Sequence, residues 1–195
     1  SIFYNGICVA NMNDYDTTTR TDDLIYSSSS RGPTQNGRKK PDLAAPGTNI
    51  MSPMYNWEGV NPDFGNWTGT SMAAPHVAGA MTLLRQRLPE ITSGEAPVIK
   101  AILINSATET GAPGWDSTYG WGYLNMTMAY NQFKYAVDPI HPAGSAGDKA
   151  FYAGSLAAGE KATLVWNRRV DYDSGGDYPV TWFAPVDLDM LLYDS

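Results

Sequence analysis

Residues 69–80 read GTSMAAPHVAGA, a run of small and apolar residues broken by one proline and one histidine. Proline has no backbone N–H and is tolerated in a helix only in the first turn. The position of Pro75 therefore predicts a helix that starts near Ser71. Gly69 and Thr70 are expected to form the tight turn that leads into it.

The predicted helix is apolar on nearly all sides. Its large apolar residues recur at helical spacing, at Val77, Met81, Leu84 and Leu88. Alanine and glycine fill the other faces. A helix of this composition belongs inside a protein, packed closely against its neighbours.

Ser71 lies at the positive end of this helix, where a backbone N–H has no partner within the helix. The free N–H and the helix dipole both stabilise the oxyanion that forms when a hydroxyl attacks a carbonyl. An isolated serine at a helix start is more often a simple N-cap. The neighbouring residues decide between the two interpretations.

The whole opening string closely resembles the nucleophile motif of the subtilisin-like serine proteases. The segments SSSSRGP at 27–33 and KPDLAAPGTNI at 40–50 resemble those that precede the serine in that family. Residues 115–124 resemble the glycine-rich stretch that opens the family's last helix. The resemblance covers residues 5–137 and implies the last third or so of a catalytic domain.

The resemblance implies a serine endopeptidase that cleaves protein or peptide substrates through an acyl-enzyme on Ser71. The backbone N–H of Ser71 would supply half of the oxyanion hole. Further residues are assigned to the rim of the oxyanion and substrate site: Thr68, Gly69, Thr70 and Met72.

Neither histidine of the chain suits the role of general base. His76 follows Ser71 by five residues, so the two side chains point about 140° apart on a helix of 3.6 residues per turn. The resemblance gives Pro75 and His76 structural positions and implies that His76 is buried. His141 stands between an isoleucine and a proline in an expected linker.

In the family the catalytic order is Asp, His, Ser. The missing acid, base and oxyanion-hole asparagine are therefore expected in a portion N-terminal to residue 1, from the same protein or a second chain. The resemblance places Asp42 in a structural loop. Four other aspartates, at 14, 16, 22 and 23, are interpreted as solvated loop charges.

Other hydrolase chemistries fit the sequence less well. An α/β-hydrolase needs a second glycine where Ala73 stands, and the Ser-x-x-Lys pattern fails at Ala74. No cluster of His, Cys, Asp and Glu has metal-ligand spacing. The chemistry requires no cofactor, although the resemblance to the subtilisin-like proteases allows structural calcium.

The composition argues against several other classes of protein. The 195 residues carry a net charge of −7 and no basic patch, which argues against a nucleic-acid partner. No apolar run is long enough to cross a membrane. The single cysteine, Cys8, excludes an internal disulfide and is expected in a buried strand. The acidic, cysteine-poor balance is typical of a secreted bacterial enzyme.

The predicted fold class is α/β: the C-terminal part of a subtilisin-like parallel-sheet domain, followed by an incomplete antiparallel β-sandwich. Residues 7–10 predict a buried strand of a parallel sheet. The other expected segments of this part are loops at 14–23 and 32–41, an irregular aromatic stretch at 53–67, and helices at 97–106 and 125–136, the last capped by Asn125.

Composition changes near Asp138. Residues 1–137 are assigned to the catalytic domain, 138–148 to a linker and 149–195 to the start of a jelly-roll-like β-sandwich. Alternating polarity predicts strands at 151–156, 162–166 and 186–193, with a turn at 157–160.

Two functional hypotheses follow. The chain is either the C-terminal portion of a serine endopeptidase, or a non-catalytic remnant that acts in binding or assembly. Residues 5–137 lack strands on which the central helix must pack. In either case a large apolar surface of that helix is expected to need a partner.

Overall fold

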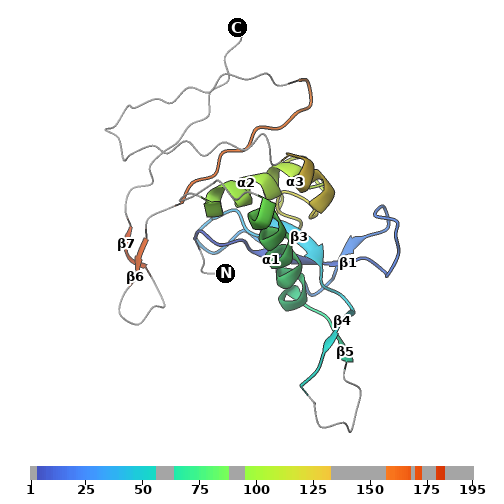
Figure 1. The fold of residues 1–195 in the computed structure, drawn as a ribbon. Coiled ribbons are helices and arrows are strands. Elements are labelled where there is room, and N and C mark those ends of the chain that lie inside the picture. Colours follow the sequence, from blue (N-terminus) through green and yellow to red (C-terminus); the bar gives the residue numbers. More distant parts are fainter. Residues whose placement is uncertain are drawn as a thin grey trace.

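A parallel pair of strands forms the centre of the computed structural model, which describes residues 4–55, 64–87, 95–132, 157–167, 170–172 and 179–182. Strand β1 (Val9–Asn13) pairs in parallel with β3 (Leu43–Pro46) and antiparallel with the short β2 (Leu24–Ile25), in the order β2-β1-β3 (Figure 1). The predicted parallel-sheet strand is confirmed, but it begins at Val9. Cys8 therefore precedes the strand and is only half-buried.

The glycine-rich segment extends this sheet along the outer edge of β3. Ala44 donates to the Gly122 carbonyl at 2.9 Å, and Leu124 donates to the Ala44 carbonyl at 2.9 Å. Gly120 has a φ of 70° and approaches the start of β3 so closely that a Cβ there would lie 2.5 Å from the Asp42 carbonyl oxygen. This position therefore requires glycine on both counts.

The part of the chain that the structure describes contains the helices α1 (Thr70–Arg87), α2 (Glu95–Ser106) and α3 (Met126–Gln132). Helix α1 packs on β1 and β3 and also contacts α2 and α3. The two predicted later helices are confirmed in place. Asn125 caps α3 as expected, because its Oδ1 accepts the Met128 N–H at 3.0 Å.

The core between sheet and helices is built from small and aliphatic side chains. From the sheet it takes Leu43 and Ala45, and from α2 it takes Val98, Ile99, Ile102 and Leu103. Helix α1 contributes Ala73, Val77, Ala80 and Leu84. The opposite face of the sheet holds a smaller cluster of Ala10, Met12, Ala44 and Tyr123.

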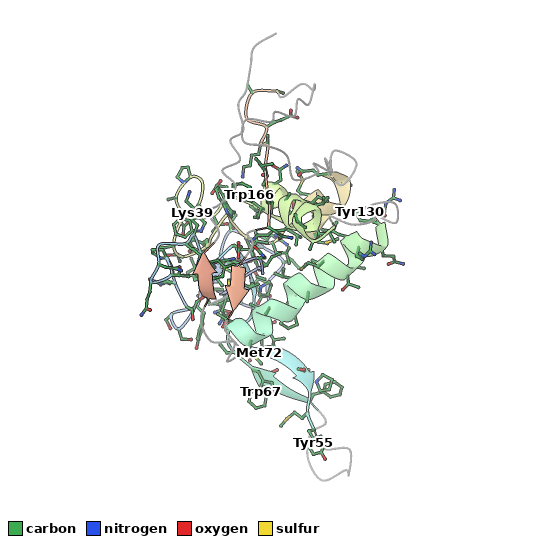
Figure 2. All side chains as sticks on the ribbon, turned by 90° about the vertical axis from the view of Figure 1, so that its left-hand side faces the viewer. Lys39, Tyr55, Trp67, Met72, Tyr130 and Trp166 are labelled. Atoms are coloured by element: carbon green, nitrogen blue, oxygen red, sulfur yellow. The ribbon has the colours of Figure 1, made fainter. Side chains whose placement is uncertain are left out.

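A β-hairpin precedes α1. Strand β4 (Ile50–Pro53) pairs antiparallel with β5 (Phe64–Trp67), and the hairpin extends away from the rest of the chain in both views (Figures 1 and 2). The prediction of an irregular stretch at 53–67 is thus wrong for residues 64–67. Cross-strand pairing with β4, which no local pattern shows, orders them.

The predictions beyond residue 149 have a mixed outcome. The turn at 157–160 is confirmed by a hydrogen bond from the Glu160 N–H to the Ala157 carbonyl at 3.0 Å. The predicted strand at 162–166 is wrong, since residues 161–167 form no strand. Thr163 instead donates to the Asn105 side chain of α2 at 2.8 Å.

Two short strands, β6 (Val170–Tyr172) and β7 (Pro179–Trp182), form an unpredicted antiparallel pair. The expected linker at 138–148 and strands at 151–156 and 186–193 lie outside the described residues. The division at 138 and the appended β-sandwich remain predictions.

Asp23 is not the solvated loop charge that the sequence suggests, because only 8% of it is exposed. Its carboxylate accepts a hydrogen bond from the Tyr123 hydroxyl. Burial raises the pKa of Asp23, and burial together with the hydrogen bond to Asp23 raises the pKa of Tyr123. The contact fastens the 14–23 loop to the far side of the sheet.

Asp42 is a structural residue, as expected, and it joins three segments at the start of β3. Its carboxylate lies 2.6 Å from the Lys40 ammonium and 2.9 Å from that of Lys100 on α2. It also accepts the Cys8 N–H at 2.7 Å. Only 4% of Asp42 is exposed, so these bonds compensate for a buried charge.

Replacing Asp42 by Asn should destabilise the chain strongly, because two nearly buried ammonium groups would lose their counter-ion. We expect a loss of about 3–5 kcal/mol in the free energy of unfolding, measured by urea denaturation. Glu109→Gln is the control, since it breaks an exposed ion pair to Lys161 and should cost less than about 1 kcal/mol. Equal costs for the two variants would contradict this role of Asp42.

Candidate active site

Ser71 is the second residue of α1 and its side chain is exposed. The Gly69 carbonyl accepts the first helical bonds, from the Met72 N–H at 3.0 Å and the Ala73 N–H at 3.2 Å. Gly69 is therefore the N-cap, and Ser71 is not. The N–H of Ser71 has no acceptor within the helix and is available to an oxyanion.

Pro75 is the sixth residue of α1, beyond the first turn in which the sequence placed it. A proline at this position removes the helical bond to the carbonyl four residues earlier. That carbonyl belongs to Ser71, so the backbone around the serine is held by fewer helical bonds than usual. The helix still starts where expected, at Thr70, next to Ser71.

The turn before Ser71 is fastened to the sheet by backbone. The Gly69 N–H donates to the Gly47 carbonyl at 2.8 Å, and the Gly47 N–H donates to the Met12 carbonyl at 3.0 Å. Beside this contact the Asn49 N–H donates to the Thr68 hydroxyl at 2.9 Å. The position of Ser71 is thus set by the loop that follows β3.

Gly47 makes this close contact possible. A Cβ at this position would lie 2.6 Å from Asn11 Oδ1, 2.7 Å from the Gly69 carbonyl oxygen and 2.9 Å from Ala73 Cβ. All three distances are too short for a real side chain. Sequence analysis did not single out Gly47, although the Ala-Pro-Gly string at 45–47 marks a turn at the end of a strand.

An open hollow of about 720 Å³ lies in front of Ser71. Its lining comes from the hairpin and from the first turns of α1: Ile50, Met51, Ser52, Trp67, Ser71, Met72, Pro75 and His76. Figure 2 shows Met72 at the start of α1 with Trp67 close by, and Tyr55 near the far end of the hairpin. Of the predicted rim residues, Met72 lines this hollow, while Thr68, Gly69 and Thr70 form the backbone that carries Ser71.

His76 is exposed, so the expectation of a buried histidine is wrong for the described structure. Its Nδ1 lies 2.9 Å from the Met72 carbonyl oxygen, one helical turn back. The ring is therefore engaged with its own helix. Among the described residues, no side chain hydrogen-bonds to the Ser71 hydroxyl, and His141 lies outside them.

The face of α1 turned away from the core is exposed along its length. Between positions 74 and 83 the exposed residues are mostly small: Ala74, Pro75, His76, Ala78, Gly79, Thr82 and Leu83. A Cβ at Gly79 would meet no atom within 4 Å. Glycine inside a helix costs about 1 kcal/mol relative to alanine, and no contact in the described structure explains it.

The described ranges contain no group of three or more His, Cys, Asp or Glu residues placed to hold a metal ion. Within the same ranges, no helix combines the length and the apolar character needed to cross a membrane.

The chain belongs to the subtilase family, because the family model matches residues 3–122. It is 35% identical over 128 residues to the serine protease AprX of Bacillus subtilis, a match that covers 61% of this chain and 28% of that protein. It is 43% identical over 72 residues to an extracellular serine protease of Serratia marcescens, covering 37% of this chain and 7% of the relative.

Solved structures agree with the family assignment. Fervidolysin of Fervidobacterium pennivorans, a keratinolytic enzyme related to subtilisin, is 29% identical with a TM-score of 0.52, over 67% of this chain and 19% of that one. The CspB protease of Clostridium perfringens is 29% identical with a TM-score of 0.51, and the match covers 65% of this chain and 26% of that one. The chain thus spans less than a third of the length of each of these relatives.

Replacing Gly47 by Ala should push the serine turn away from the sheet. We expect a loss of about 1–3 kcal/mol in the free energy of unfolding, the usual cost of overpacking, measured by urea denaturation of the chain. The control is Gly79→Ala, for which the structure has open space, and which should leave stability unchanged or raise it by up to about 1 kcal/mol. A Gly47→Ala chain as stable as the unsubstituted one would refute the close contact.

Proposed function

We propose that this chain forms the nucleophile-bearing part of a serine endopeptidase. The observation that carries the proposal is the position of Ser71: an exposed hydroxyl at the second residue of a helix, beside an open hollow, with its own N–H unused in the helix. Attack by this hydroxyl on a peptide carbonyl would form an acyl-enzyme, and the Ser71 N–H would donate to the oxyanion.

The general base and its carboxylate partner come, in this proposal, from outside the 195 residues. His76 is turned to the Met72 carbonyl, and the chain has no histidine before Ser71. Neutral serine is a weak nucleophile without a base in hydrogen-bond reach. The same protein or a second chain would supply the base together with the second oxyanion donor.

The exposed face of α1 supports a covering partner independently of the chemistry. Ala74, Ala78 and Gly79 make a smooth surface that backbone can approach closely, and Leu83 beside them is 53% exposed. Exposed apolar surfaces of this kind usually mark contact sites. We infer that the rest of the catalytic domain packs here.

Protein or peptide substrates follow from the same reaction. Since the Serratia relative is named an extracellular serine protease, we propose that the complete protein is secreted and acts outside the cell. Structural calcium, allowed by family membership, remains an expectation. The competing hypothesis, a non-catalytic remnant that acts in binding or assembly, predicts that Ser71 has no reactivity in the complete protein.

Ser71→Ala should abolish peptide hydrolysis and fluorophosphonate labelling of the complete protein, because the hydroxyl is the attacking group. Loss of the catalytic serine costs about 10⁶-fold in kcat in subtilisin, and a loss of that order is expected here. Ser106→Ala is the matched control, a buried serine at the end of α2 away from the hollow, and should keep its activity.

The chain of residues 1–195 alone should show no hydrolysis above background, since in this proposal the base comes from outside it. Activity of the complete Ser71→Ala protein would exclude Ser71 as the nucleophile. Sulfonyl-fluoride-sensitive activity of the 195-residue chain alone would exclude an external base.

The effect of Gly79→Leu on stability should differ between the chain of residues 1–195, where this face of α1 is exposed, and the complete protein, where we propose that it is covered. In the chain of residues 1–195 the change should be neutral or slightly stabilising, because the position faces open space and leucine favours a helix. In the complete protein the same change should cost about 1–3 kcal/mol through overpacking. Denaturant titration of both proteins measures the free energy of unfolding. In the complete protein, Gly79→Ala should give a value between those of the unsubstituted protein and Gly79→Leu. Equal effects in the two contexts would show that nothing packs on this face.

A further inference from the structure

Asn11 is a buried amide in the middle of β1, with 0% of its surface exposed. Its neighbours Ala10 and Met12 point to the cluster around Tyr123, so Asn11 points to the opposite face of the sheet, where α1 packs. The core on that face is aliphatic, with Leu43 and Ala45 contributed by the paired strand. A carboxamide is an unexpected residue at such a position.

The amide is only partly satisfied. Its Oδ1 accepts the Thr48 hydroxyl at 3.0 Å, whereas its Nδ2 is buried without a hydrogen-bond partner. Within the described residues it is the sole buried side-chain nitrogen in that state. A buried donor without a partner costs stability, and an aliphatic residue would avoid that cost. A role other than stability is needed to explain this asparagine.

The hydrogen bond from Thr48 connects the Asn11 amide oxygen to the loop at residues 47–49. Thr48 stands between Gly47, whose carbonyl accepts the Gly69 N–H at 2.8 Å, and Asn49, whose N–H donates to Thr68 at 2.9 Å. Fixing Thr48 therefore fixes both contacts that fasten the residues before Ser71.

The Asn11 side chain, Gly47 and the Gly69 carbonyl are packed closely together. Asn11 Oδ1 and the Gly69 carbonyl oxygen both lie within 2.7 Å of the point at which a Cβ of Gly47 would stand. Thr48 is itself buried, with 9% exposed, so solvent cannot readily replace the amide as its partner.

We propose that Asn11 is a positioning residue for the nucleophile: through Thr48 it fixes the loop at residues 47–49, and this loop sets the orientation of Ser71. The inference rests on the proposed function of Ser71. Asn11 touches neither substrate nor the reacting hydroxyl. It acts by keeping the serine in the geometry of attack, where a displacement of about 1 Å costs on the order of a hundredfold in rate.

The test uses the complete protein and two readouts: the rate constant for phosphonylation of Ser71 by a fluorophosphonate, and kcat and KM for a peptide substrate. Asn11→Val and Thr48→Val each remove the hydrogen bond. Valine is a favoured strand residue at position 11 and has the shape of threonine at position 48. Each should slow phosphonylation and lower kcat by about tenfold to a hundredfold, with KM changed less than about twofold.

The double variant Asn11→Val/Thr48→Val should be no slower than either single variant, because both break the same link. Thr48→Ser keeps the hydroxyl and should restore most of kcat. The control is Ser29→Ala, which removes the hydrogen bond from the Asn11 backbone N–H at 2.9 Å and leaves the side-chain link intact. It should lower the midpoint of thermal unfolding and leave kcat unchanged.

Wild-type phosphonylation and kcat in Asn11→Val, with Ser71→Ala still inactive, would overturn the positioning role and leave the protease function standing. Additive losses in the double variant would also overturn it. Activity in Ser71→Ala would remove the proposed function and this inference together. If Asn11→Val does not fold, the comparison of Thr48→Val with Thr48→Ser tests the proposal. A lower kcat in Thr48→Val alone supports the positioning role of Asn11, and equal kcat in the two variants overturns it.

Discussion

The hydrogen bond between the Gly69 N–H and the Gly47 carbonyl is the contact on which the candidate site depends. It joins the end of a sheet strand to the N-cap of α1, and it forms at 2.8 Å because Gly47 has no side chain in the way. The parallel pair β1 and β3 fixes Gly47, and Gly47 fixes the first residues of the helix. Ser71 and its free N–H are placed by this connection.

Helix α1 has two contrasting faces, and the contrast bears on function. One face is buried against the sheet and α2 through residues such as Val77 and Leu84. The other face exposes small residues around Gly79, and no other part of the described structure packs against Gly79. The proposed partner would pack on this open face, and in the proposal it also brings the base to the exposed hydroxyl of Ser71.

Local sequence was sufficient to predict the helices. The small-residue string at 69–80 predicted α1 with Ser71 in its first turn, and the asparagine cap predicted the start of α3. The role of Ser71 as a nucleophile stays a prediction. These features depend on residues within a few positions of each other. The parallel sheet was also predicted, since a continuous apolar run is typical of a strand buried on both faces.

The failures concern features decided by distant residues. Residues 64–67 are ordered by pairing with β4, and residues 162–166 form no strand, with Thr163 hydrogen-bonded to Asn105 of α2. His76 was expected inside an enclosed helix and lies on its open face. Asp23 looked solvated because its partner, Tyr123, is 100 residues away in the sequence. The close contact of Gly47 and the proposed role of Asn11 depend on contacts across the sheet and the serine turn, which local sequence does not show.

A crystal structure of the complete protein after reaction with a fluorophosphonate tests the central claim most directly. The phosphonyl group should be bonded to Ser71 Oγ, with its oxygen in hydrogen-bond distance of the Ser71 N–H. A histidine from outside residues 1–195 should stand beside Oγ. A phosphonyl group on another residue, or His76 in place of that external histidine, would contradict the assignment of Ser71 as a nucleophile completed from outside this chain.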